Sequence, residues 1–415
     1  GKAHFIARLR GDGSKKPVLL AAHADVVGVE REKWTVEPFT GVVQDGYIYG
    51  RGAIDVKGGL AVFAQAALEI AAEVKAGRRK LARDLIILAE ADEEGGSYPT
   101  GWLAQKAWDK IDCEFSLNEG GWIIKDEKTN KVKYVSISTA DKQSISLLVR
   151  AKGTSTHSSM PQSDNAIFRL GRALDKLSRY DTKPKLNDST RQFFSTLAQT
   201  SPEPMRSHFR NLVENRDPRK VAEADKAISQ NVLLHAIMRN TIAPVFLNAG
   251  FRGNVIPGSA DATINFRVIP GTTPGELIDE LQTVINDPLV EVTEVVQRNS
   301  AAPVSAEERK QLADIAAQRR SIPESPQNTE LYQALAKHAK LTYPEALVTP
   351  YLFQAGTDAY AWRQRGIPVY GIYPYPINAE DLERMHGNDE RVPIESLVTG
   401  LRMIKGTLLE ICEKK

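Results

Sequence analysis

Five separated stretches of the chain carry imidazole or carboxylate groups that could bind divalent metal ions. They are His23-Ala-Asp25, Asp55, Glu93-Glu94, Glu119 and His386. Imidazole and carboxylate donors suit Zn²⁺, and a catalytic zinc site keeps one position open for water. None of these stretches is specific alone, because His-x-Asp sequences are frequent and adjacent glutamates usually face solvent. Taken together, they raise the hypothesis of one metal site.

Three of these stretches follow short apolar runs that are typical of buried strands, at residues 17–22, 84–89 and 113–117. Apolar residues at three- and four-residue steps predict a helix over 60–74. Strands that alternate with helices predict an α/β fold with a doubly wound, mostly parallel sheet. Ligands of such sheets gather beyond the carboxyl ends of the strands. Charged groups at that edge are costly to desolvate unless they bind something.

The pattern changes from about residue 144. We predict a strand over 144–152, a loop, a helix with apolar positions between 167 and 177, a polar and mostly helical stretch over 181–240, a strand over 260–268 and a helix over 274–285. A Pro- and Arg-rich stretch over 298–326 resembles a linker, after which α/β patterning returns with a helix from 330, a strand over 368–373 and a last helix over 394–411. The prediction is therefore a discontinuous catalytic domain of residues 1–143 and 299–415, with an inserted α+β lid domain of residues 144–298.

Composition excludes several classes of protein. The 415 residues are 42% hydrophobic and 26% charged, with a formal net charge of +2 and no clustered basic face of the kind that binds nucleic acid. No apolar run approaches the roughly 20 residues of a membrane span. Two cysteines make no disulfide framework. Gly1 opens almost directly into strand-like sequence without a signal-peptide pattern, so we expect a soluble protein with an incomplete start and assign neither a cytoplasmic nor an exported location.

Further motifs stand in the same order along the chain. They are Tyr49-Gly-Arg-Gly-Ala-Ile-Asp55, Gly153-Thr-Ser-Thr-His157-Ser-Ser, Gly253-Asn254-Val-Ile-Pro257, Gly356-Thr-Asp358 and His386-Gly-Asn. We call the five stretches with possible metal-binding groups the metal-type stretches. Together with them, these motifs make the chain resemble the M20 metallopeptidase family, and within it the carboxypeptidase S and N-acyl amino acid hydrolase branch. The resemblance covers nearly the whole chain.

The resemblance implies a site with two Zn²⁺ ions, for which Co²⁺ or Mn²⁺ are possible replacements. Asp55 would bridge the ions, His23 and Glu119 would bind one, and Glu94 and His386 would bind the other. Asp25 would stand behind His23 and fix its tautomer. Glu93 would be the general base, taking a proton from the water whose pKa zinc lowers towards about 7.

The resemblance also implies residues for the substrate. His157 would stabilise the oxyanion of the tetrahedral intermediate, and in dimeric family members this histidine comes from the partner subunit. Thr156 departs from the family, which generally has glycine there, and makes the position of His157 less secure. Asn254 and Arg267 would hold the substrate, because the planar fork of arginine suits a carboxylate. Gly356 and Thr357 would line the same end of the pocket.

We therefore predict a zinc-dependent hydrolase that cleaves the amide bond of a small peptide or N-acyl amino acid with a free α-carboxylate. The alternatives are an M20-type aminopeptidase or dipeptidase, which would need an acidic group for a free amine, and an inactive metal-binding partner protein, which the intact Glu93 disfavours. An exposed strand edge in the lid favours a homodimer through that domain. For the insertion over 181–240, two hypotheses stay open: its apolar side chains line an acyl pocket, or they pack in the lid core. These are Phe193, Phe194, Leu197, Phe209 and Leu212.

Overall fold

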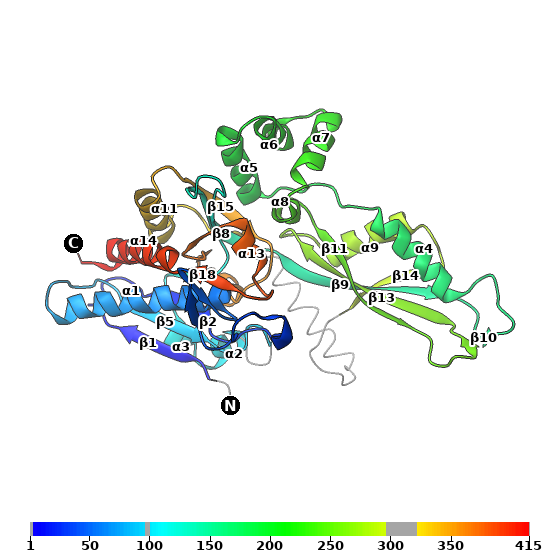
Figure 1. Cartoon of the computed structure of the whole chain (residues 1–415), viewed down its shortest axis with the longest axis horizontal. Coiled ribbons are helices and arrows are strands. Elements are labelled where there is room, and N and C mark those ends of the chain that lie inside the picture. The colour runs from blue at the N-terminus through cyan, green and yellow to red at the C-terminus, as the bar shows by residue number, and fades with distance from the viewer. Residues whose placement is uncertain (1–2, 96–99, 296–321, 415) are drawn as a thin grey trace.

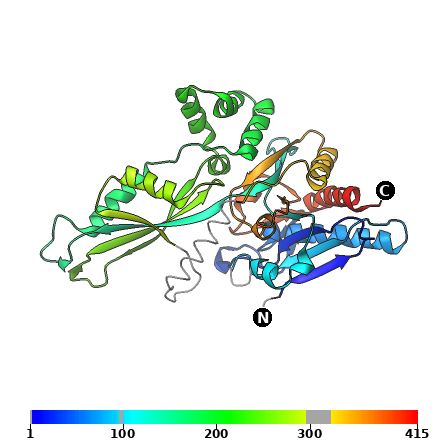
Figure 2. The ribbon, with the colours of Figure 1, turned by 180° about the vertical axis from the view of Figure 1, so that it is seen from behind.

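The computed structural model describes residues 3–95, 100–295 and 322–414. A large α/β body holds both ends of the described chain, and an elongated lid extends from it (Figure 1). The same arrangement is seen from behind in Figure 2. The predicted fold class, a mostly parallel α/β sheet with an inserted α+β unit, is confirmed.

Within the described residues, a nine-stranded sheet forms the centre of the α/β body. Its order is β1 (Phe5–Leu9), β5 (Leu85–Glu90), β2 (Val18–His23), β6 (Phe115–Asn118), β16 (Val369–Gly371), β8 (Val132–Asp141), β7 (Ile123–Lys125) and β17 (Pro376–Ile377), with β15 (Leu347–Phe353) paired to β8. Strand β2 pairs in parallel with both β5 and β6, whereas β1 and β7 add antiparallel ladders. The sequence predicted the strands β2, β5 and β6 to within two residues.

Both faces of the central sheet are covered. Leu20 of β2 joins a core with α1 (Gly58–Lys75), α11 (Glu330–Thr342) and α14 (Ile394–Cys412). Its neighbours Leu19 and Ala21 point to the other face, into a core with α2 (Thr100–Lys106), α3 (Trp108–Ile111) and α12 (Tyr360–Arg363). Successive side chains of a strand point to opposite faces. A strand covered on both sides must therefore be apolar throughout, which is why β2 is a continuous apolar run.

The lid is built on a four-stranded antiparallel sheet of order β11 (Thr241–Ala249), β13 (Ser259–Val268), β9 (Gln143–Lys152) and β14 (Val290–Val295). Helices α4 (Ala166–Ser178) and α9 (Pro274–Ile285) share one apolar core with this sheet. Thr273 and Glu276 form a capping box that starts α9 at the predicted residue. The short pair β10 (Thr156–His157) and β12 (Val255–Ile256) lies at the end of the lid farthest from the α/β body (Figures 1 and 2).

The helical insertion packs on the α/β body rather than in the lid core. It consists of α5 (Asp188–Thr200), α6 (Met205–Glu214), α7 (Pro218–Ile228) and α8 (Val232–Ile237). The ring of Phe193 packs edge-on against the rings of Tyr134 in β8 and Tyr351 in β15. The ring centroids are 5.6 and 5.3 Å apart, respectively. Phe193 and Phe194 are fully buried in this core. They do not line an open pocket, so the acyl-pocket hypothesis is wrong for these two side chains. Phe193 packs on the α/β body, whereas the ring of Phe194 stacks on that of Phe209 in α6, with centroids 5.9 Å apart. The packing hypothesis therefore holds within the insertion itself but not against the lid sheet.

Smaller elements complete the α/β body. A three-stranded sheet of β18 (Arg391–Pro393), β4 (Tyr47–Tyr49) and β3 (Val42–Gln44) lies beside α13 (Ala379–Glu383), and short helical turns span Arg31–Lys33 and Ala53–Lys57. The predicted linker lies outside the described residues from 298 to 321. In the part of the chain that the structure describes, no helix combines the length and apolarity needed to cross a membrane.

Candidate metal centre

The parallel strands bring three of the metal-type stretches to one edge of the sheet. His23 is the last residue of β2, Glu119 follows β6, and Glu93 and Glu94 follow β5. Because β2 pairs in parallel with β5 and β6, these carboxyl ends are neighbours. The edge is the one at which ligands of α/β sheets bind.

Asp55 is buried and stands between two histidines from opposite ends of the chain. Its Oδ1 lies 3.2 Å from Nε2 of His23, and its Oδ2 lies 2.9 Å from Nε2 of His386. Nε2 of His23 is also 3.6 Å from Glu119 Oε2, and Nε2 of His386 is 2.9 Å from Glu94 Oε1. Each oxygen of Asp55 therefore faces a separate group of donors.

These separations fit a pair of zinc-sized ions. Zn²⁺ bonds of about 2.0–2.2 Å in tetrahedral geometry put neighbouring donor atoms roughly 3.3–3.6 Å apart. The donor pairs around Asp55 lie between 2.9 and 3.6 Å apart. His23, Asp55 and Glu94 form one cluster of donors within 4.8 Å of one another, and His23, Glu93 and Glu119 form another. The two clusters share His23, and their donor types and spacing together fit divalent cations at this edge of the sheet.

Asp25 has two connections at this edge. Its backbone carbonyl lies 3.0 Å from Nδ1 of His23, whereas its carboxylate Oδ1 is 3.7 Å from that nitrogen. The carboxylate instead accepts the backbone N–H groups of Glu93 at 3.1 Å and Glu94 at 2.9 Å. Asp25 thus shapes the turn that carries the candidate base and one candidate ligand.

The two histidines of this acidic cluster have raised pKa values. Hydrogen bonds to Asp55 and Glu94 raise the pKa of His386 to about 10. Burial opposes a charge on His23, but its contacts with Asp55 and Glu119 outweigh burial and raise its pKa well above the usual value. An imidazole must lose its proton to bind a metal ion. Binding of metal ions here would therefore release the extra protons of these two histidines.

The carboxyl groups next to the histidines are crowded. Burial, followed by the charges of Glu119 and Asp358, raises the pKa of Glu93 to about 9. Burial and the neighbouring Asp55 raise the pKa of Glu119 to about 7. Behind them, the hydroxyl of Thr100 contacts both Glu90 and Asp358, the latter at 2.7 Å. So many buried carboxyl groups in one place favour the binding of cations.

Tyr373 is a member of this site that the sequence reasoning missed. Its hydroxyl lies 2.9 Å from Glu119 Oε2 and 3.3 Å from Asp55 Oδ1, so it can donate to either carboxylate. Its ring stacks on Trp122 with centroids 4.2 Å apart. Tyr373 follows β16 at the same carboxyl edge, and this position was the signal that could have identified it.

The lid residues predicted to bind substrate do not converge within one chain. Residues 141–143 connect β8 to β9 and form the hinge between the α/β body and the lid. Arg267 pairs with Ser144 at this end of the lid sheet, and Glu93 lies within electrostatic reach of its guanidinium. His157 is the last residue of β10, and Asn254 directly precedes β12. This pair of strands lies at the far end of the lid (Figure 1). Residues 259–267 of β13 alone span roughly 26 Å. Of these three residues, the structure brings only Arg267 towards the metal-type cluster.

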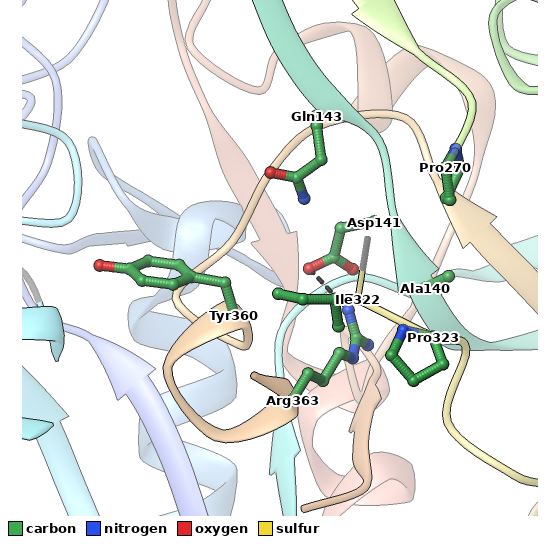
Figure 3. Close-up of a pocket in the computed structure, with 8 residues that line it drawn as sticks. All are labelled: Ala140, Asp141, Gln143, Pro270, Ile322, Pro323, Tyr360 and Arg363. Carbon is green, nitrogen blue, oxygen red and sulfur yellow. Dashed lines mark ion pairs between the residues drawn. The ribbon is translucent and has the colours of Figure 1, made fainter. Parts of the chain in front are cut away.

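The Gly356-Thr357 turn contacts the hinge between the α/β body and the lid. The buried hydroxyl of Thr357 donates to Asp141 Oδ2 at 2.6 Å, and Arg363 pairs with the same oxygen at 2.8 Å. Figure 3 shows this ion pair in a small cavity between the two units, lined also by Ala140, Gln143, Pro270, Ile322, Pro323 and Tyr360. The turn is therefore tied to the last residue of β8.

Comparisons with known proteins agree with this architecture. The family profile described as Peptidase family M20/M25/M40 matches residues 19–410. Over 391 residues the chain is 31% identical to a probable carboxypeptidase S-like 2 of Dictyostelium discoideum, covering 93% of this chain and 70% of that relative. Over 405 residues it is 28% identical to the N-fatty-acyl-amino acid synthase/hydrolase PM20D1 of Homo sapiens, covering 97% of this chain and 75% of the relative.

Among solved structures, the M20 family metallo-carboxypeptidase Sso-CP2 from Sulfolobus solfataricus superposes with a TM-score of 0.64 at 16% identity, covering 98% of this chain and 87% of that one. The fold and the relatives define a hydrolase of amide bonds. The chain belongs to Peptidase family M20/M25/M40, and the resemblance seen in its sequence motifs is confirmed.

Proposed function

We propose that this hydrolase uses two Zn²⁺ ions to cleave the amide bond of small peptides or N-acyl amino acids that carry a free α-carboxylate. The observation that carries the proposal is the bridging position of Asp55, whose two oxygens face His23 and His386 at 3.2 and 2.9 Å. His23 and Glu119 would hold one ion, and Glu94 and His386 the other. Co²⁺ and Mn²⁺ are the alternative ions that we propose for the same donors.

The metal ions, when bound, would polarise the scissile carbonyl and acidify the attacking water. Glu93 would take the proton from that water and deliver it to the leaving nitrogen. Its position beside His23 and Glu119, within the same cluster of donors, supports this role. Its pKa of about 9 in the absence of metal reflects burial and negative neighbours, and positive charge at the site would lower it.

Arg267 supports a substrate with a free carboxylate. It lies at the hinge end of the lid sheet, and its guanidinium interacts electrostatically with the carboxylate of Glu93. A guanidinium there would bind a carboxylate in bidentate geometry, and closure of the lid would exclude water from the site. The name of the human relative includes a fatty-acyl amino acid, so N-acyl amino acids with long chains belong in the substrate set to be tested.

A hydrolysis screen tests this function. N-acyl amino acids with short and long chains would be compared with dipeptides, N-acetyl dipeptides and dipeptide C-amides, with and without added Zn²⁺. We expect activity that requires zinc and a free carboxylate, and a fall in kcat of about 10²–10⁴ for Glu93→Ala. Equal activity of this variant and the parent would refute the mechanism, and a requirement for a free amine would favour an aminopeptidase.

We also propose a homodimer through the lid. Strand β11 is an edge of the lid sheet and exposes Val245, Phe246 and Leu247. Exposed apolar edge strands invite pairing with another chain. A second copy could also receive His157, which lies at the far end of the lid and is exposed.

Mixing two inactive variants tests the dimer. If His157 acts in the partner's site, a re-equilibrated equimolar mixture of Glu93→Ala and His157→Ala should regain about one quarter of the parental activity, because half of the dimers would contain one complete site. Light scattering would give the mass of the parent. A monomeric mass would refute the dimer, and a dimer without recovery would refute the shared site.

A further inference from the structure

The carboxylate of Glu390 organises the turn that carries Asp55. It is fully buried, and both of its oxygens are used. Oε1 accepts the backbone N–H groups of Ile54 at 2.7 Å and Asp55 at 3.1 Å. Oε2 accepts the backbone N–H of Gly52 at 3.2 Å and a guanidinium N–H of Arg51 at 2.5 Å. One side chain from the C-terminal part of the chain thus fixes a turn in the N-terminal part.

Arg51 extends this connection to the loop of His386. Its Nη2 donates to the backbone carbonyls of His386 at 3.2 Å and Gly387 at 2.7 Å. Its guanidinium lies over the ring of the buried Trp34, 5.2 Å from the centroid. The planar fork of Arg51 is therefore held by Glu390, by two carbonyls and by an aromatic face, with only 3% of its side chain exposed.

The loop of His386 needs this support. His386 has a φ of 61°, in the left-handed region that residues other than glycine rarely adopt. Its side chain is 47% exposed, so burial does little to fix it. The two carbonyl groups that Arg51 holds belong to His386 itself and to the next residue. A buried ion pair contributes little net stability on average. The role of this pair is instead to hold the backbone of the two loops in a fixed position.

We propose that Arg51 and Glu390 form a positioning pair that sets the distance between Asp55 and His386, two ligands of the proposed metal site that are 331 residues apart in the chain. The pair contacts the backbone of both ligand segments and binds no metal itself. This inference rests on the proposed function, because the distance matters only if the two side chains share an ion. Groups that orient metal ligands typically change metal affinity by about 10- to 100-fold when they are replaced.

Zinc affinity tests the proposal without using activity. The chelator-treated parent, Arg51→Lys and Glu390→Gln would be titrated with ZnCl₂ against a chromophoric chelator. Lysine keeps the charge of Arg51 but has no fork to join Glu390 to the two carbonyls. Glutamine turns one acceptor of Glu390 into a donor that faces N–H groups. We expect both variants to bind zinc about 10- to 100-fold more weakly, with parental far-UV circular dichroism.

Arg83→Lys is the matched control. Arg83 is also a fully buried arginine, which donates to the carbonyl of Ile411 at 3.0 Å and pairs with Glu114 at 2.7 Å. It precedes β5, whereas the candidate base follows the other end of that strand. We expect this variant to lose stability but to bind zinc like the parent.

The outcomes separate the two claims. A parent that fails to take up two equivalents of zinc refutes the proposed function. A parent that takes them up, with both variants binding equally tightly, refutes only the positioning pair, as does an equal loss of affinity in Arg83→Lys. If Glu390→Gln does not fold, Arg51→Lys decides.

Discussion

The carboxylate of Asp25 accepts the backbone N–H of Glu94 at 2.9 Å, in addition to that of Glu93 at 3.1 Å. Two consecutive amides bound by one carboxylate fix the direction in which both glutamate side chains leave the backbone. Since Glu94 is a proposed ligand and Glu93 the proposed base, Asp25 controls their relative position more directly than it controls the ring of His23.

Replacing Asp25 by alanine should therefore impair the turn and not only the tautomer of His23. We expect kcat/KM to fall by about 10- to 100-fold, together with zinc affinity. The measurement is steady-state kinetics at saturating zinc, combined with a zinc titration. Asp126→Ala is the control, because Asp126 also accepts two backbone N–H groups, from Lys128 and Thr129, in an exposed turn. Parental kinetics for Asp25→Ala would contradict this role.

Tyr373→Phe removes only the hydroxyl that faces Glu119 and Asp55, and keeps the ring stacked on Trp122. A buried acceptor left without its donor costs about 1–3 kcal/mol. We expect zinc affinity to fall roughly tenfold, the equivalent of about 1.4 kcal/mol. Tyr370→Phe, which loses a hydroxyl bonded to Thr329 away from the metal-type cluster, should bind zinc normally. Equal zinc affinities for the two variants would show that the Tyr373 hydroxyl is dispensable.

Lys142, at the hinge, should make stability depend on pH. It is fully buried and donates to the carbonyls of Ala236 and Arg239. Burial, with the nearby charges of Arg267 and Arg239, lowers its pKa to about 7. The unfolded chain, with a lysine pKa of about 10.4, binds more protons above pH 7, so the free energy of unfolding should rise between about pH 7 and 10.

Comparison with Lys142→Met isolates this contribution. Thermal midpoints of the parent and of this variant would be measured from pH 6 to 10. The difference between them should change in favour of the parent as the pH rises through about 7 to 10, because only the parent loses the buried charge. A constant difference over this range would mean that Lys142 does not change its protonation state there.

Phe193→Ala tests how the helical insertion is attached. The side chain fills the core shared with Tyr134 and Tyr351, so we expect a loss of about 3–5 kcal/mol in the free energy of unfolding. Chemical denaturation of the zinc-loaded protein would measure it. Phe168→Ala, at a site on α4 that is 70% exposed, should change little. An unchanged free energy of unfolding for Phe193→Ala would contradict this packing.

The sequence predicted best what depends on local periodicity. The strand ending at His23 is apolar on both faces, and α9 begins at a capping box. Each of these elements can therefore be recognised from a few consecutive residues. The metal-type residues were found because each follows a strand or stands in a motif. Glu390 and Tyr373 were missed because their roles depend on contacts with residues more than 250 positions away. The packing of Phe193 against β8 and β15 likewise depends on tertiary contacts that a helical pattern does not specify.

The contact between Asp55 and His386 also has a consequence for biosynthesis. The proposed pair of ions cannot be captured until the ribosome has released the segment beyond residue 386, since one ligand comes from the N-terminal part and another from the C-terminal part. The lid and the helical insertion are translated before that moment. A nascent chain would thus stay inactive through most of its synthesis, and zinc loading would follow folding.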